Sequence, residues 1–149
     1  MSLAGNIHSL VDVEAPPFVP PGWSVQVHLS GPPVLNFHDR FGFYVSREQQ
    51  KGAVSGYELR KSLEGKPVVN ANVLDFLLKK LPDSPRYLSD RWKYDMHDHP
   101  RYIFFWGTIY LHEGEPLVRC LHWDNFRWTS SYGWLSSQWN AYYQALTYV

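Results

Sequence analysis

Residues 101–135 form an aromatic and β-branched stretch that constrains the fold more than any other part of the chain. Four of the seven tryptophans lie in it, in three runs that short polar turns separate. Such runs, bounded by Gly, Asp, Asn and Pro, are typical of antiparallel strands. We therefore predict a three-stranded meander with strands near residues 102–111, 117–123 and 127–134. The first run is apolar on both faces, which indicates a central strand.

The strongest helix signal lies at residues 70–81. Leucines and a valine recur there at helical spacing, and Asn70 or Asn72 provides an N-cap. Asp75 near the start and two lysines at the end would complement the helix dipole. Pro82 then ends the pattern, since proline cannot continue a helix.

The other segments give weaker signals. Alternation at residues 23–29 predicts a half-buried strand, and Ser55 with a glutamate three residues later predicts a short helix. The remaining expectations are a strand pair or one bent strand at 34–46, a loop at 47–56, a second short helix at 87–92, and either a helix or an edge strand at 135–149.

This order of elements predicts one α+β domain at residues 23–149, preceded by a proline-rich arm at residues 1–22. We expect a mainly antiparallel sheet, with the C-terminal meander in it and one or two helices packed on one of its faces. The arm would lie on the surface or swap to a partner, because its four clustered prolines disfavour regular structure.

Charge and composition narrow the class of protein. Lys+Arg and Asp+Glu number 14 each, and this neutral balance disfavours nucleic-acid binding but permits a homodimer. The single cysteine excludes an internal disulfide and fits a reducing compartment. Because neither a signal peptide nor a long apolar run is present, we expect a cytoplasmic protein with no membrane association.

Three blocks of sequence occur in a characteristic order: Asn-Ala-Asn-Val-Leu-Asp-Phe-Leu-Leu at 70–78, Tyr-Ile-Phe-Phe-Trp-Gly-Thr-Ile-Tyr at 102–110, and Val-Arg-Cys-Leu-His-Trp at 118–123. This order resembles a pattern in a family of small uncharacterised bacterial proteins, over roughly residues 66–139. The resemblance implies a bacterial, soluble protein. It carries no known activity, so it transfers no functional residue to this chain.

The sharpest polar cluster is Asp95, His97 and His99. In an extended segment the two histidines would point the same way, and with a flanking carboxylate they could hold a metal for a hydrolase-like reaction. A third ligand would come from elsewhere, with His112 and His122 as candidates. The alternative is a solvated loop, since the spacing lacks the repeated character of zinc motifs, and we expect neither a metal nor another cofactor.

Two further residue pairs could carry chemistry. His38 beside Asp39 could act as a general base, although a turn in which Asp39 binds nearby backbone is the simpler interpretation. Cys120 and His122 could approach each other on one strand face, but a lone cysteine within a strand is more often a small buried hydrophobe.

Aromatic residues make up 17% of the chain, which raises the expectation of a recognition surface. Strand alternation would place Trp106 with Tyr110 on one face of the first strand, and Trp128 with Tyr132 on one face of the third. Arg119 could add a donor or a stacking cation. These five residues are our candidate ligand-binding set, although a buried core is the alternative for most of the rings.

We therefore predict a non-catalytic binding protein that uses an aromatic-lined surface or cleft for a small ligand or a protein partner. A metal-dependent hydrolase using the loop of Asp95, His97 and His99 is one alternative. An immunity or antitoxin-type partner protein is another.

Overall fold

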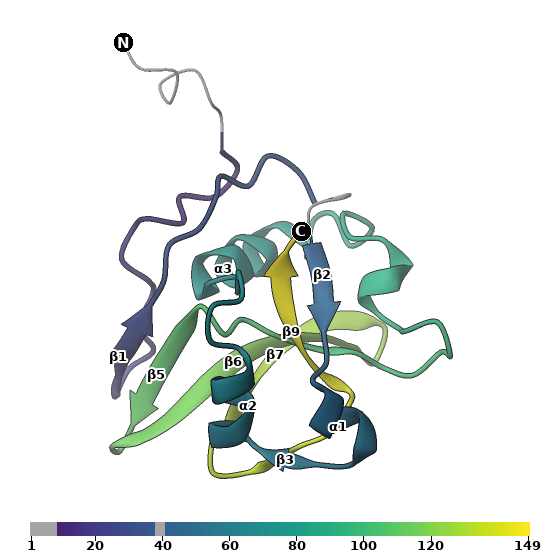
Figure 1. Cartoon of the computed structure of the whole chain (residues 1–149). Coiled ribbons are helices and arrows are strands. Elements are labelled where there is room, and N and C mark those ends of the chain that lie inside the picture. The colour runs from purple at the N-terminus through teal and green to yellow at the C-terminus, as the bar shows by residue number, and fades with distance from the viewer. Residues whose placement is uncertain (1–8, 38–40) are drawn as a thin grey trace.

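The computed structural model describes residues 9–37 and 41–149, which form an α+β structure with a curled, mostly antiparallel sheet (Figure 1). The helices are α1 (Arg47–Lys51), α2 (Gly56–Ser62) and α3 (Ala71–Lys80), with a 3₁₀ turn at Asp90–Trp92. The strands are β1 (Trp23–His28), β2 (Phe41–Tyr44), β3 (Val54–Ser55), β4 (Tyr102–Phe104), β5 (Thr108–His112), β6 (Glu115–Asp124), β7 (Arg127–Trp134), β8 (Gln138–Trp139) and β9 (Tyr143–Tyr148).

Within the described residues, seven strands form one sheet in the order β1-β5-β6-β4-β9-β2, with β7 on the other edge of β6. Only the β4–β9 pair of this sheet is parallel. β9 therefore lies inside the sheet, between β4 and β2, whereas the sequence favoured an edge strand or a helix there. No helix in the described part of the chain is long and apolar enough to cross a membrane.

The run expected as one strand at 102–111 is broken by residues 105–107, which leave the ladder between β4 and β5. Tyr102 pairs with His122 and Tyr110 with Leu117, so both pieces lie along the same edge of β6. The Gly107 amide donates to Val69 O at 2.9 Å, and the Gly107 carbonyl accepts from Leu29 N at 2.7 Å. The three-residue interruption reverses the alternation of side chains beyond it.

The two faces of the sheet are covered by different helices, whereas the sequence placed the helices on one face. α3 packs Val73, Leu74 and Leu77 against a face that includes Ile103 and Leu121. Figure 1 shows α3 above the sheet and α1, α2 and β3 below it. We call these the α3 face and the α2 face. On the α2 face, Leu59 and Leu63 join a cluster with Phe104, Val118, Cys120 and Trp139.

The predicted helix of residues 70–81 is present as α3, and Asn70 fixes its start. The Asn70 side chain accepts from Asn72 N at 3.0 Å, and it donates to Val13 O at 2.8 Å and to Leu29 O at 2.9 Å. Asn70 is 1% exposed, so these bonds are shielded from water. One side chain thereby caps the helix and ties it to two earlier segments of the chain.

Two local expectations were wrong. The segment predicted as a loop at 47–56 contains α1, whose N-cap Ser46 and Gln49 satisfy each other's amides in a capping box. In the described part of residues 34–46 only β2 is a strand, while Val34 forms an isolated bridge to Val11.

Val11 and Val13 are buried in the core, so this part of the proline-rich segment packs against the chain's own domain.

Candidate functional site

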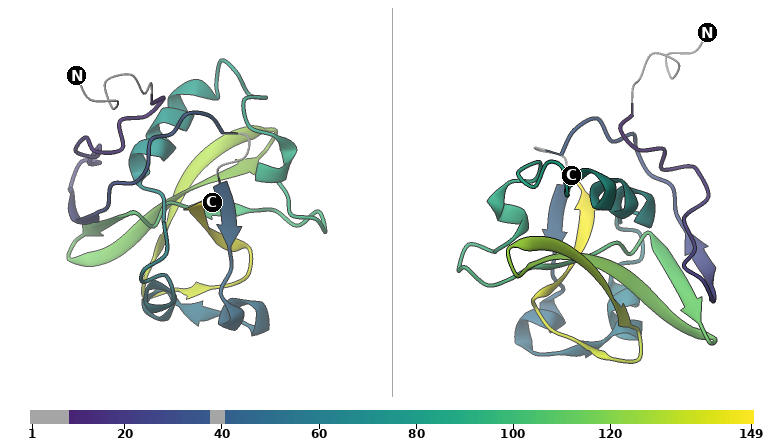
Figure 2. Two further views of the ribbon diagram at one scale, coloured as in Figure 1. Left: turned by 45° about the horizontal axis from the view of Figure 1, so that its top comes forward. Right: turned by 180° about the vertical axis from the view of Figure 1, so that it is seen from behind.

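The long β6–β7 hairpin carries a row of aromatic residues on the α3 face. Its ladder is unbroken from Leu117 paired with Trp134 to Asp124 paired with Arg127. Figure 2 shows this hairpin curving across the molecule. Because β7 is unbroken, Trp128, Tyr132 and Trp134 share one face, as strand alternation predicted.

The tip of the hairpin is a two-residue turn with a residue type that does not suit its backbone. Asn125 and Phe126 have φ angles of 51° and 60°, the left-handed pair of a type I′ turn. Such turns favour glycine at the second position, where the hairpin between β5 and β6 has Gly114 at φ 79°. Phe126 is strained by about 1 to 2 kcal/mol relative to a right-handed residue. The residue is 91% exposed, so burial does not offset this strain.

Phe126 borders an apolar cavity of about 350 Å³ between the end of α3 and the hairpin. We call this cavity the Trp128 groove. Its lining residues are Leu78, Leu81, Pro82, Pro85, Phe126, Arg127 and Trp128.

The Trp128 ring holds the groove in shape from the sheet side. It is half-buried, and its Nε1 donates to Pro85 O at 3.4 Å. Its other neighbour is Trp123, in an edge-to-face contact with ring centroids 5.4 Å apart. These contacts preorganise the ring, so a group that entered the groove would meet a surface already ordered.

The other predicted aromatic residues on the broken strand do not form a platform. Trp106 is 3% exposed on the α2 face, with its ring 5.1 Å from that of Trp139. Tyr110 is fully buried on the α3 face, and its hydroxyl donates to Phe18 O at 2.8 Å. The interruption at 105–107 puts them on opposite faces, and both are core residues. The edge of Trp106 also lines a separate cavity of about 270 Å³ on the α2 face, away from the hairpin.

Arg119 is held by an ion pair rather than left free to bind a ligand. Its guanidinium donates to both carboxylate oxygens of Asp75, at 2.9 and 3.1 Å. Burial lowers the pKa of Arg119, but the hydrogen bond and charge of Asp75 outweigh this and raise it above the ordinary value. The Asp75 carboxylate thus links α3 to β6 through an ion pair, whereas the sequence predicted that it would complement the helix dipole.

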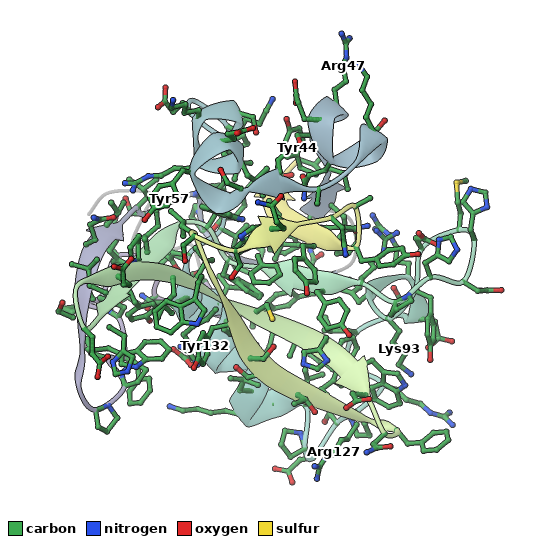
Figure 3. All side chains as sticks on the ribbon, turned by 90° about the horizontal axis from the view of Figure 1, so that it is seen from below. Tyr44, Arg47, Tyr57, Lys93, Arg127 and Tyr132 are labelled. Carbon is green, nitrogen blue, oxygen red and sulfur yellow. The ribbon has the colours of Figure 1, made fainter. Side chains whose placement is uncertain are left out.

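Tyr132 lies opposite Arg119 in the ladder and is 47% exposed. Its ring contacts Trp23 and Trp134 edge-on, with centroids 5.4 and 5.6 Å apart. Figure 3 shows Tyr132 and Arg127 on the hairpin, on the opposite side of this view from Arg47 of α1. Of the five predicted ligand residues, Trp128 and Tyr132 thus lie at the surface of the α3 face.

The loop with Asp95, His97 and His99 uses its carboxylate to order its own backbone. Asp95 Oδ1 accepts from His97 N at 2.8 Å and from His99 N at 3.0 Å. Burial would raise the pKa of Asp95, but these bonds and the charges of His99 and Arg101 lower it. The two imidazole centroids are 6.1 Å apart, and no group of three His, Cys, Asp or Glu side chains in the described ranges could hold a metal ion.

The candidate pair His38 and Asp39 lies outside the residues that the structure describes. The two proposed third ligands lie on β5 and β6 and pack against other rings. The His112 ring centroid is 6.0 Å from those of Trp23 and Trp134, and its buried Nδ1 has no hydrogen-bond partner among the described residues. The His122 ring packs 4.9 Å from that of Tyr102.

Cys120 is expected to be chemically inert in the folded protein. It is 1% exposed, its Sγ is 3.0 Å from Ser131 Oγ, and burial raises the pKa of its thiol to about 11. Because the thiolate is the reactive form, Ellman's reagent at pH 8 should label the native protein only as fast as it unfolds. One equivalent should react at once in denaturant. Prompt labelling of native protein would contradict this assignment.

Comparisons with protein-family models, with curated proteins and with solved structures find no significant match to this chain. Phe126 was not singled out from the sequence, although a turn between the strands near 117–123 and 127–134 was predicted. The signal that could have found it is a phenylalanine directly after asparagine, where a hairpin turn favours glycine.

Proposed function

We propose that this chain is a non-catalytic binding protein, and that the Trp128 groove receives an apolar group from a protein partner or a small ligand. The proposal rests on the exposure and the backbone conformation of Phe126. The residue is 91% exposed and has a φ of 60°, so neither burial nor backbone preference explains a phenylalanine there. An exposed aromatic beside a preformed apolar cavity is typical of a binding anchor.

The surroundings of the groove also support binding rather than catalysis. Arg127 is the only ionisable residue among the groove's lining residues. General acid–base or nucleophilic chemistry needs at least one group that can exchange a proton or form a bond near neutral pH. Proline and leucine side chains supply contact area and shape only, which suits recognition.

Replacing Phe126 by glycine should separate binding from stability. The variant should be more stable by roughly 0.5 to 1 kcal/mol, because glycine adopts the left-handed conformation without strain. It should also bind the neutral dye N-phenyl-1-naphthylamine about tenfold more weakly, because a large apolar contact is lost. Dye fluorescence titrations and urea unfolding measure the two effects.

Tyr57→Ser is the matched control, since Tyr57 is 45% exposed and lies on α2, away from the groove (Figure 3). This variant should bind the dye with the affinity of the original protein. The proposal fails if the original protein does not bind the dye, or if Phe126→Gly binds it equally well.

A further inference from the structure

The charges around the Trp128 groove indicate what kind of partner it receives. We propose that the groove binds a protein segment in which an apolar side chain is flanked by carboxylates. This inference rests on the proposed function and names the partner class for the same site.

The first argument is Arg127, the charged member of the groove lining. It is exposed, and among the described residues no ion pair engages it. Asp124 is its ladder partner across the turn but forms no ion pair with it there. A guanidinium at the edge of an apolar cavity can form a two-point bond with an incoming carboxylate.

The second argument is the local excess of positive charge. Residues 78–86 and 124–128, which build the groove, contain four cations and two carboxylates, all exposed. The two lysines at the end of α3, Lys79 and Lys80, also offset the negative end of the helix dipole. The positive sign is local, because the chain as a whole has a net charge of zero.

A fifth cation, Lys93, contacts the groove through Trp123. Lys93 Nζ is 3.9 Å from the centre of the Trp123 ring, and Trp123 in turn contacts Trp128. Asp90 pairs with Lys93 at 3.1 Å, which reduces the contribution of this lysine. The attraction for an acidic segment therefore depends mainly on Arg127 and the end of α3.

Two other occupants fit less well. A second copy of the chain, docked groove to groove about a two-fold axis, would bring like charges together, including the two Arg127 side chains. Single-stranded nucleic acid needs a path of cations and several stacking rings, whereas leucines and prolines form most of this groove.

The test uses two fluorescein-labelled peptides with the same alternating leucine and phenylalanine positions. Glutamates separate these positions in one peptide, and lysines separate them in the other. By fluorescence anisotropy the glutamate peptide should bind at least about tenfold more tightly at low salt, and added salt should narrow the difference. Arg127→Gln should weaken binding of the glutamate peptide several-fold, a larger loss than the same change causes for the neutral dye.

The matched control is Arg47→Gln, which removes an exposed cation on the far side of the molecule from Arg127 (Figure 3). This variant should bind the glutamate peptide and the neutral dye with the affinities of the original protein. Equal binding of the two peptides, with dye binding retained, overturns the acidic partner and keeps the proposed function. Failure of the original protein to bind the dye overturns the proposed function itself. Tighter binding of oligothymidylate than of the glutamate peptide, or a dimer that Arg127→Glu abolishes, also overturns the inference.

Discussion

Replacement of Gly107 by alanine should destabilise the protein by about 3 kcal/mol or more. A Cβ at this position would lie 2.7 Å from the backbone N and Cα of Asn70 and from the carbonyl carbon of Val69. Backbone atoms cannot rotate away as the end of a side chain can. The chain would have to shift, and the bonds from Gly107 N to Val69 O and from Leu29 N to Gly107 O would weaken.

Urea unfolding followed by tryptophan fluorescence measures this loss. Gly52→Ala is the matched control, because nothing lies within 4 Å of the added Cβ and φ is 168°, an extended value that any residue adopts. The control should change the free energy of unfolding by less than about 0.5 kcal/mol. If Gly107→Ala matched the control, the close approach of the 105–107 interruption to α3 would be wrong.

Breaking the ion pair between Asp75 and Arg119 should produce the second large effect. Asp75→Asn should cost about 2 to 3 kcal/mol, because it leaves a buried guanidinium without its carboxylate. Arg119→Met should cost less, because the Asp75 side chain is 23% exposed and that of Arg119 only 10%. The carboxylate left behind in Arg119→Met can still reach water.

A double variant tests whether Asp75 and Arg119 stabilise the protein through their contact with each other or independently. Asp75→Asn combined with Arg119→Met should cost less than the two single changes added together, with a coupling energy on the order of 1 kcal/mol or more. Urea unfolding of all four proteins completes the cycle. Strict additivity would mean that the pair does not hold α3 against β6.

Local signals in the sequence predicted the elements whose causes are local. The alternation from Trp23 predicted β1, and Asn70 with the helical leucine spacing predicted α3. α1 was missed because its one buried residue is Gln49, so it has no apolar periodicity. The capping box of Ser46 and Gln49 was the available signal for it.

The sequence wrongly placed Trp106 and Tyr110 on one face of the sheet, and the cause lies outside the strand. Alternation held for Trp128 and Tyr132, because β7 is uninterrupted. It failed between Trp106 and Tyr110, because the ladder is interrupted at residues 105–107, where Gly107 bonds with residues 29 and 69, far away in the chain. No pattern within the strand records such a contact. The groove was equally hidden, because it combines the end of α3 with a hairpin more than 40 residues further along.

The position of β9 has a consequence for the order in which the protein folds. β2 enters the sheet only through β9, and the bond from Thr147 Oγ1 to Gly42 O spans 105 residues of chain. Such distant pairing slows folding, because the entropy cost of closing a large loop comes before any stabilising contact forms. The β6–β7 hairpin, by contrast, closes through a two-residue turn. We therefore expect the β6–β7 hairpin to form early. β2 should pair only after β9 has paired with β4.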